Sequence, residues 1–211
     1  PTNISTTPLG GLTYNLHVPC TDNKWTAATL KTCGGTGTLV YDHAYEDGYC
    51  TACGVAEDGS NLCGDRVVWN FDEETGVLTL TGIGSTYNYE LGDIKLESYV
   101  FLAIKDQVKE IVVGEGITIL GKHIFYQMPI EKVTLPNSLT HIDTRALGGG
   151  GKLTEVVIPS QLANLGFNCL VGSGATDIYM LGGVPANIST TPLGGLTYKL
   201  HIPCTDDSWT E

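Results

Sequence analysis

Apolar residues recur with a period of 22 or 23 residues between Val108 and Met180. Three full copies of the pattern follow one another, and a fourth begins at Thr176. The first inward position of each copy is taken by Ile111, Val133, Val156 and Ile178, and the second by Val113, Leu135, Ile158 and Met180. A fixed period of this length is typical of a solenoid, because a single coil cannot bury its apolar side and must stack on its neighbours.

Each copy has two halves that differ in periodicity. The first half, such as Glu155–Ile158, alternates polar with β-branched residues and predicts a short strand. Pro136 and Pro159 come directly after such strands, where the missing amide donor can end a ladder. The second half places apolar residues at wider intervals, as at Ile117, Leu120, Ile124 and Phe125. This spacing predicts a loose or helical turn with one inward face.

Two alternating runs precede the first coil. VVWNF and VLTLTGI, within residues 66–83, flank a polar connection from Asp72 to Gly76 and predict a β-hairpin. Placed before the coils, the hairpin would cover the N-terminal end of the solenoid. Residues 87–107 predict an irregular segment with a helical turn. The predicted fold is therefore a β-rich (α+β) solenoid over residues 63–204 with an N-terminal β-hairpin cap.

The two ends of the chain are near copies of each other. Residues 1–26 recur as residues 185–210, and only positions 2, 15, 18, 23 and 24 differ. Such identity indicates about one period of a tandem array in a longer protein. We expect the second copy to form the closing rung that shields the apolar end of the solenoid. The first copy would be the orphan rung of a preceding unit, either poorly ordered or paired with another edge.

This organisation predicts five segments. They are the orphan rung at 1–26, a Cys/Gly-rich linker at 27–62, the hairpin cap and lead-in segment at 63–107, the coils at 108–184, and the closing rung with the start of the next linker at 185–211. The predicted strand of the orphan rung, residues 12–18, also offers an edge for self-association.

Composition and charge exclude several classes of protein. Apolar residues make up 42% of the chain, which is enough for a core and argues against global disorder. The formal charge of −12 would repel phosphate backbones, so we expect no nucleic-acid partner. No uninterrupted apolar run approaches the ~18 residues needed to span a bilayer, so we expect no transmembrane segment in this sequence.

Cysteine and histidine residues gather in the predicted linker. Cys50 and Cys53 form a Cys-x-x-Cys turn, which can point two thiolates at one metal ion. Cys33 and His43 could complete a Cys₃His set for structural zinc. A segment this short and polar would need such a staple to fold.

Two alternatives for these cysteines stay open. Disulfides, including pairs with Cys20 or Cys63, are one alternative, and unlinked thiols are the other. The count of seven cysteines does not by itself establish an oxidising compartment. A redox role would need the Cys-x-x-Cys motif at a helix N-terminus in a βαβ context, which the polar linker does not offer.

No arrangement of residues predicts catalysis. The chain has no Gly-x-Ser-x-Gly elbow for a nucleophile. His123 and His141 lie in coil turns, where we expect surface residues. Acidic pairs such as Asp72 and Glu74 fall in predicted turns, where acids are common. We therefore predict a chain that is not an enzyme and that needs no cofactor apart from the structural zinc.

Parts of the chain resemble a known family. Residues 132–147 (KVTLPNSLTHIDTRAL) and 155–170 (EVVIPSQLANLGFNCL) resemble the leucine-rich repeat of BspA-like bacterial cell-surface proteins. Residues 63–89 are similar to the stretch that often precedes the first coil in clostridial members, and residues 43–54 are similar to a short linker motif of that group. The resemblance implies a BspA-type leucine-rich repeat solenoid that is extracellular or on the bacterial cell surface. Four glycines at 148–151 depart from the pattern and predict a locally irregular coil.

The resemblance also implies adhesion, with a host or bacterial surface protein or a glycan as partner. Stacked strands form an extended sheet suited to such contacts, and we expect them at its outward positions. These positions are Glu110, Val112, Lys132, Thr134, Glu155, Val157, Asp177 and Tyr179. They lack an aromatic cluster, so two alternatives stay open: a structural spacer in a long surface protein, or a carbohydrate-contacting module that accompanies an enzyme.

Overall fold

The chain divides into two compact units, Pro1–Gly59 and Ser60–Glu211. The computed structural model describes residues 13–22, 30–31, 36–46, 49–96 and 98–209.

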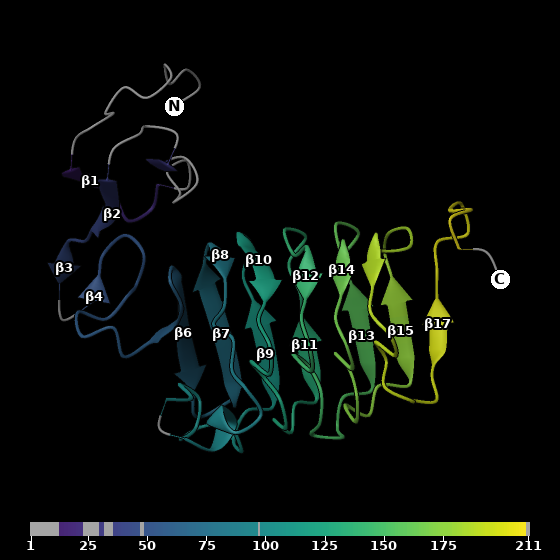
Figure 1. The fold of residues 1–211 in the computed structure, drawn as a ribbon. Coiled ribbons are helices and arrows are strands. Elements are labelled where there is room, and N and C mark those ends of the chain that lie inside the picture. The colour runs from purple at the N-terminus through teal and green to yellow at the C-terminus, as the bar shows by residue number, and fades with distance from the viewer. Residues whose placement is uncertain (1–12, 23–29, 32–35, 47–48, 97, 210–211) are drawn as a thin grey trace. The chain divides into compact units, whose positions relative to one another are not determined.

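The second unit is a solenoid whose coils stack through parallel strands (Figure 1). The strands predicted at the start of the coils are β9 (Glu110–Val113), β11 (Lys132–Thr134), β13 (Glu155–Ile158), β15 (Asp177–Met180) and β17 (Lys199–His201). Ile111 lies opposite Val133 in the β9–β11 pair, and Val156 lies opposite Ile178 in the β13–β15 pair. The predicted register of the apolar positions is therefore confirmed.

A second parallel sheet runs along the other side of the coils. It consists of β8 (Gly84–Ser85), β10 (Ile117–Leu120), β12 (His141–Ile142), β14 (Asn164–Leu165) and β16 (Asn187–Ile188). The sequence predicted loose or helical turns here, and this was wrong for these short stretches. Their backbone is extended because equivalent positions of successive coils lie side by side and pair their amides and carbonyls, as when Asp143 N–H donates to Leu120 O at 2.9 Å.

An antiparallel cap covers the N-terminal end of the solenoid, as predicted. It is formed by β5 (Leu62–Gly64), β6 (Val67–Asp72) and β7 (Val77–Gly82). The Asp72 carboxylate closes the hairpin turn by accepting the amides of Glu74 and Thr75 at 2.9 and 3.2 Å. On its other edge β7 pairs in parallel with β9, which makes the cap continuous with the first coil.

The lead-in segment before the first coil supplies an aromatic part of the core. It is built of turns with one short 3₁₀ helix, Asp93–Lys95, in agreement with the predicted irregular segment. Tyr99, Phe101 and Phe125 are fully buried, with ring centroids 5.7 and 5.9 Å apart in sequence order. The Tyr99 hydroxyl donates to Ile124 O at 2.8 Å, so its burial leaves no polar group unsatisfied.

His123 is buried, which contradicts the expectation of a surface residue. Its backbone has φ 55°, a left-handed conformation. Its Nδ1 lies 2.7 Å from Tyr89 O, and its ring packs edge-on against Tyr126 at 5.4 Å. The lead-in segment thus brings a carbonyl partner for Nδ1 that local sequence does not reveal, whereas Nε2 is buried without a hydrogen-bond partner.

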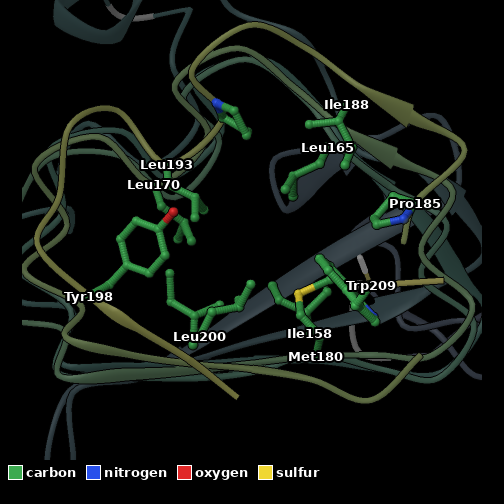
Figure 2. Close-up of a pocket in the computed structure, with 12 residues that line it drawn as sticks. Ile158, Leu165, Leu170, Met180, Pro185, Ile188, Leu193, Tyr198, Leu200 and Trp209 are labelled. Atoms are coloured by element: carbon green, nitrogen blue, oxygen red, sulfur yellow. The ribbon is translucent and has the colours of Figure 1, made fainter. Parts of the chain in front are cut away.

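The C-terminal end of the solenoid is left open. Strand β17 pairs with β15 as the predicted closing rung should. Nevertheless Tyr198, Leu200 and Ile202 of this rung are exposed, and Figure 2 shows apolar side chains around a cavity of about 150 Å³. The rung thus covers the inward residues of the coil before it, such as Ile178 and Met180, and exposes its own inner face.

The first unit pairs the predicted orphan rung with an unpredicted strand. Strand β1 (Thr13–Pro19) runs parallel to β2 (Thr36–Asp42), with Leu16 opposite Leu39. Pairing with another edge was one of the two outcomes expected for this rung. The predicted linker thus contains a seven-residue strand, followed by a hairpin of β3 (Tyr45–Glu46) and β4 (Tyr49–Cys50). Self-association through the other edge of β1 stays a prediction.

The four-glycine turn depends on glycine backbone geometry. Gly149, Gly150 and Gly151 all have positive φ angles, between 68° and 78°. A Cβ added at Gly150 would overlap the backbone carbonyl of Met128 in the coil before. The predicted irregularity of this coil is thus a tight turn in which the backbones of neighbouring coils approach closely.

We expect Gly150→Ala to lower the free energy of unfolding by about 2 kcal/mol or more, since it adds left-handed strain and a backbone overlap. Gly92→Ala is the matched control, because Gly92 has φ −74° and open space around its Cα. Urea unfolding followed by circular dichroism measures both variants. Equal unfolding midpoints would contradict the close approach at Gly150.

Candidate functional site

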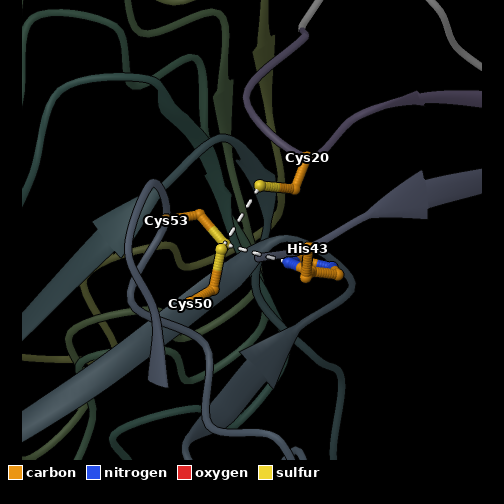
Figure 3. Close-up of side chains that lie close together, drawn as sticks. All are labelled: Cys20, His43, Cys50 and Cys53. Atoms are coloured by element: carbon orange, nitrogen blue, oxygen red, sulfur yellow. Dashed lines mark hydrogen bonds between the residues drawn. The ribbon is translucent and has the colours of Figure 1, made fainter. Parts of the chain in front are cut away.

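One cluster of metal-ligating side chains lies in the first unit. Figure 3 shows Cys20, His43, Cys50 and Cys53 pointing toward one another. Their sulfur and nitrogen donor atoms all lie within 4.8 Å of one another. Cys20 Sγ and Cys50 Sγ are 3.6 Å apart, and Cys53 Sγ is 3.3 Å from His43 Nδ1. Among the residues that the structure describes, no other group of three or more His, Cys, Asp or Glu side chains converges in this way.

Strand pairing positions two of the four side chains. Cys20 directly follows β1 and His43 directly follows β2. Pro19 lies opposite Asp42 at the ends of these strands, and Cys20 N–H donates to Asp42 O at 3.1 Å. The parallel register therefore sets the Cys20 and His43 side chains next to each other.

The Cys-x-x-Cys turn supplies the other two side chains. Its ends are tied by two backbone hydrogen bonds, from Gly54 N–H to Cys50 O at 2.9 Å and from Cys50 N–H to Val55 O at 2.8 Å. Gly54 has φ 75°, a conformation that glycine adopts without strain. Thr51 anchors the turn to Ala44, next to His43, through both its amide and its hydroxyl. The local sequence thus folds both thiols onto the strand ends.

The surroundings of the cluster shift the pKa values of two of its thiols in opposite directions. Burial raises the pKa of Cys50, but hydrogen bonds from the backbone of Ala52 and Cys53 and from the side chain of His43 outweigh it and lower the pKa to about 5. Burial and hydrogen bonds with Cys53 and Cys50 raise the pKa of Cys20 to about 12. Cys50 is therefore the thiol that most readily gives up its proton here.

No disulfide joins any of the six cysteines that the structure describes. The 3.6 Å separation of the Cys20 and Cys50 sulfurs is far longer than the roughly 2.05 Å of a disulfide. Three sulfurs and one imidazole nitrogen make the donor set that zinc prefers in structural sites. The four side chains together could therefore hold one metal ion.

The structure brings together three of the four predicted zinc ligands, His43, Cys50 and Cys53. The fourth, Cys33, lies outside the described residues. Cys20 completes the cluster, and sequence reasoning assigned it only to possible disulfides. The signal that could have found it is the offset of 23 residues between β1 and β2, the same spacing that separates the coils of the solenoid.

The predicted contact residues lie on the outward side of β9, β11, β13 and β15 and form two rows, which we call the strand face. These strands belong to two sheets, because β9 and β11 pair with the cap strands and β13 pairs with β15 and β17. The charged row contains Glu110, Lys132, Glu155 and Asp177, and the uncharged row contains Val112, Thr134, Val157 and Tyr179. Lys132 Nζ pairs with Glu110 Oε1 at 2.6 Å. Val157 is the large apolar residue of the strand face that is most exposed.

The last rung extends both rows. His201 stacks on Tyr179, with ring centroids 4.1 Å apart, and its Nε2 lies 2.9 Å from Asp177 Oδ1. The hydrogen bond from His201, followed by that from Thr176, lowers the pKa of the Asp177 carboxyl. The Tyr179 ring is thus fixed by its stacking on the ring of His201.

Within the described residues no helix is long and apolar enough to cross a membrane. The chain matches none of the curated proteins with which it was compared. A leucine-rich repeat protein from Eubacterium ventriosum is 16% identical, with a TM-score of 0.45 over 67% of this chain and 43% of that one. The pneumococcal vaccine antigen PcpA is also 16% identical, with a TM-score of 0.47 over 97% of this chain and 51% of that one. This chain thus spans about half the length of each solved protein.

The family comparison identifies the coils. The model of the BspA type leucine rich repeat region matches residues 90–188 in six copies. These residues include the last part of the lead-in segment and every coil from β9 to β16. The repeat region of this chain therefore belongs to the BspA-type leucine-rich repeat family.

Proposed function

We propose that this chain is a non-enzymatic module of an extracellular or bacterial cell-surface protein, and that it binds a protein partner through the strand face. The observation that carries the proposal is the pairing of a charged row with an uncharged row that includes Val157, whose exposed fraction is 41%. Repeat solenoids expose such extended, regular surfaces, which suit contact with another protein.

The strand face favours a protein over a glycan. A sugar ring is recognised by open aromatic faces, whereas Tyr179 is already stacked on His201. Val112, Thr134 and Val157 instead present small apolar and hydroxyl groups at equivalent positions of successive coils. With Lys199 of the last rung, which lies opposite Asp177, the charged row holds three acids and two bases, so its net charge is negative and it favours a partner with basic residues.

A structural spacer is the second candidate. The observation that favours it is the near identity of residues 1–26 and 185–210, which fits a repeated unit that sets length rather than specificity. A carbohydrate-contacting module beside an enzyme is the third. All three candidates share the solenoid, so they differ only in what the strand face contacts.

Val157→Asp on the strand face should weaken binding to a protein hit by about tenfold or more, since it places a charge in the uncharged row. Phe167→Asp is the matched control: Phe167 also has an exposed fraction of 41% but lies beyond β14, outside the strand face. An array of bacterial and host extracellular proteins and glycans supplies the hit, and surface plasmon resonance measures both variants.

The outcomes separate the candidates. Protein binding that Val157→Asp abolishes and Phe167→Asp preserves supports the strand face. Hits confined to glycans support the carbohydrate-contacting module, and a chain that binds nothing across the array supports the spacer. Binding that both substitutions leave unchanged would place the contact elsewhere and overturn the proposal.

A further inference from the structure

We propose that Cys20, His43, Cys50 and Cys53 bind one structural zinc ion, and that the segment they staple is a cap for the end of a solenoid. We call residues 13–56 the Cys/His cap. The geometry of the ligands supports the metal. In tetrahedral zinc sites two sulfurs are about 3.8 Å apart and a sulfur and a nitrogen are slightly closer. The observed separations of 3.6 and 3.3 Å are close to these values.

The participation of histidine argues for a metal rather than a disulfide. A disulfide would use two sulfurs and leave His43 without a role, yet His43 Nδ1 lies 3.3 Å from Cys53 Sγ. Apolar burial in the described part of the cap is also small. Apart from cysteines it consists of Val18, Leu30, Val55 and Ala56. A core of this size rarely stabilises a fold by itself, so a staple such as a bound metal ion would supply much of the stability of the cap.

The purified 211-residue chain should bind one zinc ion, and Cys20→Ser should reduce zinc retention at least about tenfold, because it removes one of four ligands. Cys204→Ser is the matched control, since Cys204 occupies the equivalent position of the second end copy and lies outside the cluster. Cys33→Ser tests the ligand expected from sequence. Inductively coupled plasma mass spectrometry counts the metal, and intact mass under denaturing conditions counts disulfides.

Zinc lost in Cys20→Ser and retained in Cys204→Ser and Cys33→Ser is the expected result. Zinc lost in Cys33→Ser but not in Cys20→Ser would overturn the assignment of ligands. A metal-free chain with a mass deficit of two hydrogens per bridge would overturn the zinc site itself. Either reading is independent of binding at the strand face.

The two end copies of the sequence also indicate what covers the open end of the solenoid. Strand β1 and the rung that contains β17 have nearly the same sequence, TYNLHVP at 13–19 and TYKLHIP at 197–203. They have different neighbours: β1 pairs with β2, whereas β17 pairs with β15. Nearly the same sequence thus pairs with a strand that follows it in the first copy and with a strand that precedes it in the second.

The two neighbours use opposite edges of the rung. Lys199 N–H donates to Thr176 O in the coil before, at 2.7 Å. The first copy has Asn15 at this position, and Cys20, five residues later, donates to Asp42 at the end of β2. The amides of successive residues in an extended strand point to opposite edges of the strand. The amides of two residues that lie five positions apart therefore point to opposite edges as well. Strand β2 therefore occupies the edge that β17 leaves free.

Burial changes accordingly between the two copies. Val18 beside β2 is 5% exposed, whereas its counterpart Ile202 is 44% exposed. Cys20 is buried, and its counterpart Cys204 is exposed. The offset of 23 residues between β1 and β2 also equals a coil spacing of the solenoid. Strand β2 thus pairs with β1 as the strand of one further coil would.

The geometry points to one occupant for the open end: a segment of the same kind as residues 27–56, following the last rung in the same chain. Its β2-type strand would pair with the free edge of β17 and cover Leu200 and Ile202. Its histidine and Cys-x-x-Cys turn would take Cys204 as fourth zinc ligand. A short covalent connection favours this arrangement over a second molecule, whose own β2 is already paired with β1.

The test extends the chain by a second copy of residues 27–59 placed after Thr210. The extended chain should bind two zinc ions, and Cys204→Ser in it should return the count to one. Cys20→Ser in the same chain should also leave one ion. Hydrogen–deuterium exchange should show slower exchange at Leu200 and Ile202 than in the 211-residue chain, since both amides gain a carbonyl partner.

A second ion that persists in the extended Cys204→Ser chain would overturn this inference, as would unchanged exchange at Leu200. An extended chain with one ion, bound through Cys20, would do the same while leaving the first zinc site intact. The failures of the two inferences are therefore distinguishable.

Discussion

The whole structure depends on one constraint: a coil is satisfied only when another coil lies on each side of it. Outward residues donate their amides to the coil before, as Asp177 does to Thr154 and Lys199 does to Thr176. Inward residues such as Ile111, Leu139 and Ile178 are buried by the stacking of several coils. Both ends of the stack therefore present unpaired backbone and apolar side chains. The antiparallel hairpin of β6 and β7 resolves this at the N-terminal end.

The C-terminal end of the stack also presents unpaired backbone and apolar side chains, and fewer residues are available to cover them. Leu200 and Ile202 stay exposed after the last rung forms, and apolar groups line a cavity beside them. The Cys/His cap offers a parallel strand with coil spacing but little apolar mass. Small units that cannot build a sufficient core rely on a metal or on cross-links. The proposed zinc site and the open end are thus two consequences of one architecture.

Sequence periodicity was enough to predict most of the solenoid, because the register of its strands follows from the spacing of Ile111, Val133, Val156 and Ile178. It did not predict the second sheet, since stretches of two to four residues acquire extended backbone only from neighbouring coils. Strand β2 was missed because its coil spacing occurs once, within a Gly- and Thr-rich segment. Without that strand, nothing local could set Cys20 beside His43.

The buried His123 was missed for a similar reason, because its partner is a carbonyl 34 residues earlier in the chain.

The central claim is that one rung sequence has opposite neighbours at the two ends, and residue-resolved amide hydrogen exchange of the 211-residue chain tests it most directly. The account predicts slow exchange at Leu16 and Lys199 with fast exchange at Asn15 and Leu200, an alternation that reverses between the copies. The same residues protected in both copies would contradict it.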